Sequence, residues 1–123
     1  MTQERIAAPL AAALAGRGYQ TLTSVQQAML DPDARGRDLL VSAQIGSGKT
    51  VAFGLAAASD LLGGDATLLP EGTTPLALAI APTRELALQV AAELAWLYAG
   101  AGARITVASS RTCVKRGLVN WLP

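Results

Sequence analysis

Short runs of consecutive apolar residues alternate along this chain with longer stretches in which apolar residues recur every three or four positions. The helical pattern is clearest in the second half, where Leu86, Val90 and Leu94 are spaced by four residues, as on one face of a helix. The apolar runs are typical of strands, and the first suits a strand that is buried on both faces of a parallel sheet. These runs cover residues 38–42, 76–81 and 104–108.

This alternation predicts an α/β fold, in which a parallel sheet of about three strands is covered by helices. Strands that are connected through helices imply right-handed crossovers. Proline and glycine near the helix ends, with Thr23 or Ser24 and Thr83 as N-caps, set the expected helix limits. The expected helices cover residues 4–17, 25–30, 51–62 and 84–99, and a surface loop is expected at residues 63–75.

A glycine-rich stretch, Ala43 to Thr50, follows the first apolar run and precedes a helical segment. Gly46 and Gly48 let the backbone curl so that several N–H groups point into one concavity, and the helix adds the positive end of its dipole. Lys49 can reach the phosphates of a nucleotide, and the Thr50 hydroxyl can hold Mg²⁺. The alternative is a simple turn before a helix with an exposed lysine. The strand–loop–helix context favours a phosphate site, although the usual pattern starts with glycine where Ala43 stands.

Composition sets bounds on the class of protein. With 123 residues, of which 51% are hydrophobic and 15% charged, the chain has the size and apolar content of one modest domain. A single cysteine, Cys113, excludes an internal disulfide framework, and the lack of histidine argues against a zinc site. The start of the chain lacks the apolar stretch of a signal peptide, and no apolar run has membrane-spanning length. We therefore expect a cytoplasmic protein with no membrane segment and no disulfide-linked partner.

Three blocks stand in order along the chain: Gly18-Tyr19 with Thr23-Ser24-Val25-Gln26, then Ala43 to Thr50, then Pro82-Thr83-Arg84-Glu85-Leu86. Together they resemble the motifs of the DEAD-box family of ATP-dependent RNA helicases. The first block is similar to the family's Q motif. The second is similar to its phosphate loop, A-x-x-G-x-G-K-T, which accounts for Ala43. The third matches motif Ia, P-T-R-E-L.

The resemblance implies that Tyr19 stacks on adenine, that Gln26 reads the adenine edge, and that motif Ia contacts the RNA backbone. A side-chain amide offers adenine both a donor and an acceptor, and the start of a capped helix suits phosphates. ATP and Mg²⁺ are the implied cofactors, with Mg²⁺ at Thr50, and single-stranded or structured RNA is the implied partner. The implied nucleotide-binding residues are Tyr19, Gln26, Ala43, Gly46, Ser47, Gly48, Lys49 and Thr50, and the implied RNA-binding residues are Pro82, Thr83, Arg84 and Glu85.

The chain also departs from the family pattern. The family usually has proline where Leu22 and Ser24 stand, threonine at Ile45, and a Gly-Gly turn where residues 109–112 read Ser-Ser-Arg-Thr. The D-E-A-D run, the S-A-T motif and the second domain with its arginine finger are absent from this sequence. We therefore expect residues 1–108 to form a partial RecA-like ATP-binding domain. Residues 109–123 are expected to be an atypical tail, frameshifted or disordered.

The leading hypothesis is an ATP-binding, RNA-contacting N-terminal part of a DEAD-box RNA helicase. Hydrolysis and unwinding would need the absent motifs, so we expect the chain alone to be inactive as an enzyme. One alternative is a stand-alone adenine-nucleotide-binding regulatory module without catalysis. Another is a small-molecule kinase or GTPase with a phosphate loop. Tyr19 and Gln26 argue against a GTPase because the site would read adenine, and no substrate motif supports a kinase.

Overall fold

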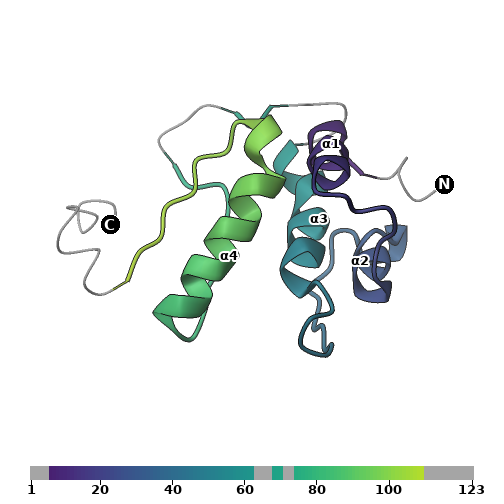
Figure 1. Ribbon diagram of the computed structural model, residues 1–123, viewed down its shortest axis with the longest axis horizontal. Coiled ribbons are helices and arrows are strands. Elements are labelled where there is room, and N and C mark those ends of the chain that lie inside the picture. Colours follow the sequence, from purple (N-terminus) through teal and green to yellow (C-terminus); the bar gives the residue numbers. More distant parts are fainter. Residues whose placement is uncertain (1–5, 63–67, 71–73, 110–123) are drawn as a thin grey trace.

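Helices form the regular secondary structure of the residues that the structure describes, which are 6–62, 68–70 and 74–109. The structure is a computed structural model. Its elements are α1 (Ala8–Gly16), α2 (Ser24–Met29), the 3-10 helix η2 (Pro32–Ala34), α3 (Lys49–Leu62), α4 (Arg84–Leu97) and the 3-10 helix η3 (Ala99–Ala101) (Figure 1). The four predicted helices are therefore confirmed, with small shifts at their ends. The predicted loop at 63–75 and the predicted tail lie largely outside the described residues.

Threonine side chains set the start of two helices, as the sequence predicts. Thr23 is the N-cap of α2: its Oγ1 accepts a hydrogen bond from the Gln26 N–H at 3.4 Å, and its own N–H donates to Gln26 Oε1 at 3.0 Å. This reciprocal pair is a capping box. Thr83 caps α4, where its Oγ1 accepts a hydrogen bond from the Leu86 N–H at 3.2 Å. Such a cap stabilises a helix by about 0.5–2 kcal/mol relative to alanine.

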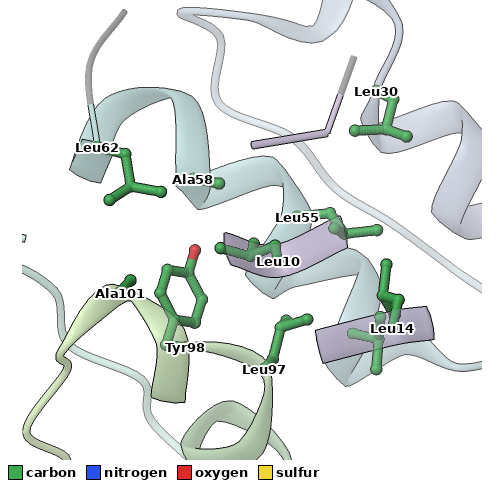
Figure 2. Packing of buried hydrophobic residues seen from close by; sticks show 10 residues of the cluster. Leu10, Leu14, Leu30, Leu55, Ala58, Leu62, Leu97, Tyr98 and Ala101 are labelled. Atoms are coloured by element: carbon green, nitrogen blue, oxygen red, sulfur yellow. The ribbon is translucent and has the colours of Figure 1, made fainter. Parts of the chain in front are cut away.

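Apolar side chains of α1, α3 and α4 meet in one hydrophobic core (Figure 2). α2 packs against α3, while α1 packs against α4 and η3. Burying one large aliphatic side chain favours folding by about 1.5–3 kcal/mol, so the leucines supply most of the stabilisation. The buried cluster consists of Leu10, Leu14, Leu30, Val51, Leu55, Ala58, Leu62, Leu97, Tyr98 and Ala101.

α3 and α4 approach each other closely at Gly54. A Cβ on Gly54 would lie 2.5 Å from Leu97 Cδ2 and 3.2 Å from Leu94 Cδ2, so only glycine leaves room for these leucines. The Tyr98 hydroxyl donates a hydrogen bond to the Gly54 carbonyl oxygen at 2.5 Å. Burial raises the pKa of the Tyr98 hydroxyl to about 12, because a phenolate would lose its hydration.

The predicted parallel sheet is wrong for this structure. None of the described residues lies in a strand, and the apolar runs 38–42, 76–81 and 104–108 are coil (Figure 1). Their large side chains are also not buried: Leu40 is 101% exposed and Ile80 is 88% exposed. The element type and the burial expected for these runs are therefore both corrected.

The reason lies in what an apolar run can specify. An extended segment becomes a strand only where a neighbouring strand supplies partners for its N–H and C=O groups. The run shows that a segment suits burial, but it does not show which segment covers it. In this structure the core is formed by helices that pack against one another, and each helix satisfies its own backbone hydrogen bonds. The extended runs are left outside that core.

Candidate functional site

The glycine-rich loop leads directly into α3, which begins at Lys49. Gly46 and Gly48 have φ angles of +84° and +79°, a region that residues with a Cβ rarely adopt. A Cβ on Gly48 would also collide with the Gln26 side-chain nitrogen. The curled backbone predicted from these two glycines is therefore present.

Two side chains from the start of α2 hold this loop. Thr23 Oγ1 donates a hydrogen bond to the Ser47 carbonyl oxygen at 2.8 Å, and Gln26 Nε2 donates one to the Gly48 carbonyl oxygen at 3.3 Å. Gln26 is fully buried, so water does not compete for its amide. The structure thus gives Gln26 a contact with the loop that the motif did not indicate. The bond to Gly48 uses one of the two N–H groups of the Gln26 amide. The bond from the Thr23 N–H uses one acceptor position of the amide oxygen.

The polar groups of the loop suit an anion. Lys49 Nζ donates a hydrogen bond to the Ala43 carbonyl oxygen at 2.8 Å, which links the two ends of the loop. Ser47 Oγ is buried, and no described residue provides it with a hydrogen-bond partner. A buried polar group without a partner costs roughly 1–3 kcal/mol, so an incoming ligand oxygen would relieve that cost. Thr50 is half-buried in the first turn of α3.

Tyr19 lies beside a hollow of about 150 Å³. None of residues 43–50, all of which are described, lines this hollow. Tyr19 is 36% exposed, and its ring centroid lies 5.9 Å from that of Trp96. Trp96 was not singled out from the sequence. A tryptophan in the last turn of a helix whose other apolar residues are aliphatic is a signal that could have indicated it. The hollow is lined by Ile6, Ala11, Leu14, Ala15, Tyr19, Gln20, Thr21, Leu22 and Gln27.

The motif Ia residues lie at the start of α4, and all of Pro82, Thr83, Arg84 and Glu85 are exposed. α3 and α4 pack against each other, and both begin at the lower end of the view in Figure 1. The glycine-rich loop and motif Ia therefore face the same end of the helix pair. Tyr19 contacts Trp96, which lies in the last turn of α4.

Two further searches bear on the kind of site. Among the described residues, no group of three or more His, Cys, Asp and Glu side chains could hold a metal ion. None of the described helices is long and apolar enough to cross a membrane.

Comparison with known proteins agrees with the three motifs. The profile of the DEAD/DEAH box helicase family matches residues 23–117. The chain is 44% identical over 86 residues to DEAD-box ATP-dependent RNA helicase 3B, chloroplastic, of Zea mays; the match covers 69% of this chain and 12% of that protein. It is 43% identical over 81 residues to DEAD-box ATP-dependent RNA helicase 9, mitochondrial, of Arabidopsis thaliana, covering 66% and 13%.

A further relative is DEAD-box ATP-dependent RNA helicase 53 of Oryza sativa subsp. japonica, which is 44% identical over 80 residues, covering 65% of this chain and 13% of that protein. The matched part of this chain thus spans about an eighth of the length of the curated relatives. The names of two relatives place them in chloroplasts and mitochondria, so the compartment of this chain stays a prediction. No solved structure matches the chain. The family profile covers most of the sequence, including the loop and motif Ia, and the chain belongs to the DEAD/DEAH box helicase family.

Proposed function

We propose that this chain binds adenine nucleotide at the loop from Ala43 to Thr50 and contacts RNA at the start of α4, as the N-terminal part of an ATP-dependent RNA helicase domain. The observation that carries the proposal is the way the loop is held. Thr23 and Gln26 bond the carbonyl oxygens of Ser47 and Gly48 from the side of α2. The Ser47 N–H donates to the Gln44 carbonyl oxygen at 3.2 Å, so an anion would use the N–H groups at the start of α3, which have no partner within the helix.

The charged and hydroxyl groups of the loop would have different roles in nucleotide binding. The Lys49 ammonium, which bonds the Ala43 carbonyl oxygen in this structure, would move its hydrogen bonds to phosphate oxygens. The buried Ser47 hydroxyl would gain the partner that no described residue gives it. Thr50 would hold Mg²⁺, which neutralises phosphate charge and takes its other ligands from nucleotide and water.

Base recognition is assigned to Tyr19 and Gln26. A tyrosine face can stack on any base, so it supplies affinity with little selectivity. Gln26 would supply selectivity through the N–H group and the oxygen position that its bonds to Thr23 and Gly48 leave unused. Because Gln26 is fully buried, adenine can reach it only if the first turn of α2 shifts slightly when nucleotide binds.

RNA contact is assigned to residues 82–85. The exposed Arg84 guanidinium and the N–H groups at the start of α4 suit phosphate oxygens. The Thr83 hydroxyl already accepts the Leu86 N–H, and it can still donate its own hydrogen to RNA. Contacts of this kind position a nucleic-acid backbone without reading its sequence.

The test is calorimetric titration of the chain with ATP and with GTP. Lys49→Ala should remove most of the binding of either nucleotide, because the phosphate charge loses the lysine of the loop. Arg35→Ala, which removes an exposed positive charge outside the loop, should leave both affinities unchanged. Equal affinity for ATP and GTP in the unsubstituted chain would show that the adenine assignment is wrong, and binding that survives Lys49→Ala would show that the loop is not the site.

A further inference from the structure

Arg17, Tyr19 and Trp96 form a surface cluster where the end of α1 meets the last turn of α4. The ring centroids of Tyr19 and Trp96 are 5.9 Å apart, with an interplanar angle of 32°. The guanidinium carbon of Arg17 lies 4.8 Å from the centroid of the Trp96 ring. Both distances fall within the ranges of favourable aromatic and cation–π contacts.

The backbone and the ring of Tyr19 are held by different elements. The Tyr19 N–H donates a hydrogen bond to the Leu14 carbonyl oxygen at 3.0 Å, which ties the backbone to α1. The ring contacts Trp96 of α4 instead. Since Tyr19 is 36% exposed, part of its surface stays open to a planar ligand. Trp96 itself is partly buried against the core, so it offers a firm support.

We infer that Trp96 is a positioning residue, which holds the Tyr19 ring in the orientation that receives an adenine base, while Arg17 holds Trp96. The inference rests on the proposed nucleotide binding and adds a residue that none of the three motifs contains. A side chain that is already fixed loses little conformational freedom when a ligand binds to it. Trp96 therefore raises affinity for the base without touching the nucleotide.

Fluorescence gives a direct test, because the chain has two tryptophans, Trp96 and Trp121. Trp121→Phe leaves Trp96 as the remaining tryptophan. Titration of this variant with ADP should change the Trp96 emission, because the base would stack on the ring beside it. Titration with pyrophosphate, which can fill the phosphate loop alone, should leave the emission nearly unchanged.

Calorimetry separates positioning from general stability. Trp96→Leu should weaken ADP binding about threefold to tenfold, the cost of ordering one free side chain, and should leave pyrophosphate binding unchanged. Trp96→Phe keeps a ring at this position and should recover most of the ADP affinity. A purely structural role would weaken both ligands equally. Circular dichroism of each variant shows whether it is folded.

Each outcome decides the matter. Equal ADP affinity in Trp96→Leu and in the unsubstituted chain, or an equal loss for pyrophosphate, overturns the role of Trp96 and leaves the proposed function standing. If Trp96→Leu does not fold, the Trp121→Phe titration decides, and an emission that does not respond to ADP overturns the inference. If the unsubstituted chain binds pyrophosphate but not ADP, the adenine site and its positioning residue both fall. If it binds neither ligand, the proposed function falls with them.

Discussion

At the scale of single residues, Thr23 does two things with one hydroxyl. Its oxygen accepts the Gln26 N–H and so caps α2, while its hydrogen is donated to the Ser47 carbonyl oxygen. A hydroxyl can do both because it is donor and acceptor at once. The start of α2 and the shape of the loop are therefore coupled through one side chain.

Thr23→Val keeps the shape of the side chain and removes the hydroxyl. The free energy of unfolding should fall by about 1–2 kcal/mol through loss of the cap and of one buried hydrogen bond. Affinity for ADP and for pyrophosphate should fall together, because the loop is no longer held. Denaturant titration and calorimetry measure the two effects, and Thr23→Ser should restore both.

A second cap distinguishes the effect on the loop from the effect on stability. Thr83→Val removes the cap of α4, where the Thr83 hydroxyl bonds the Leu86 N–H rather than the loop, so it should lower stability without changing ADP affinity. If Thr83→Val weakened ADP binding as much as Thr23→Val does, nucleotide affinity would simply follow stability, and the coupling through Thr23 would be refuted.

At the scale of elements, the spacing of α3 and α4 depends on Gly54. An alanine there would place its Cβ against Leu97, which is fully buried and has little room to move. Overpacking of this kind destabilises by about 1–3 kcal/mol, so Gly54→Ala should lower the midpoint of thermal unfolding. Gly16→Ala is the matched control, since no atom lies within 4 Å of its added Cβ. It should be neutral or slightly stabilising, because alanine favours a helix. Equal midpoints for the two variants would contradict the close packing.

The same helix contact predicts a loss of stability in alkali. The pKa of Tyr98 is raised from its ordinary value of 10.0 to about 12, so the folded chain keeps this proton more tightly than the unfolded chain. Stability from this group is full below pH 10 and is lost as the pH rises from about 10 to about 12, because the unfolded state ionises first. Denaturant midpoints measured across this window should fall more steeply for the unsubstituted chain than for Tyr98→Phe. Parallel curves would show that Tyr98 does not ionise differently in the two states.

The sequence predicts helices well here because their signals are local. Thr23 and Thr83 mark helix starts, and the apolar spacing of residues 86–94 indicates a helix. That spacing does not mark the buried face of α4, because Leu86 is 43% exposed and the buried residue of α4 is Leu97. The strands failed because their signal is not local: Leu40 and Ile80 stand in apolar runs, yet no described segment pairs with those runs. The site shows the same difference between local and non-local signals. Two glycines predicted the curl of the loop, whereas the contact between Tyr19 and Trp96 joins residues 77 positions apart, and no pattern along the chain indicates it.

At the scale of the whole molecule, the functional groups are distributed over one helix pair. The glycine-rich loop and motif Ia lie where α3 and α4 begin, and the cluster around Trp96 lies where α4 ends (Figure 1). α4 therefore carries a proposed RNA contact at one end and a proposed support of the base at the other. The proposed contacts at the two ends concern binding, whereas hydrolysis of ATP needs further groups around the γ-phosphate.

Phosphoryl transfer depends on placing a water molecule and on stabilising charge around the γ-phosphate. Lys49 and Thr50 would supply part of the charge stabilisation. Glu85 and Glu93 belong to α4, and neither forms a hydrogen bond or ion pair with the loop among the described residues, so we expect neither to orient water at the phosphates. A missing general base costs about 10²–10⁴ in rate, and a missing arginine finger costs about 10³–10⁵. Together these losses remove most of a helicase-like rate.

We therefore expect the 123-residue chain to show no RNA-stimulated ATP hydrolysis and no unwinding, although we propose that it binds ATP. A phosphate-release assay with and without single-stranded RNA measures this, and Lys49→Ala serves as the blank because it removes the proposed nucleotide contact. Glu85→Gln and Glu93→Gln should match the unsubstituted chain. Turnover above the blank that RNA raises, and that either glutamine variant abolishes, would mean that an acid of α4 reaches the loop when RNA binds. In that case the lack of a bond between these two glutamates and the loop would hold only for the chain without RNA.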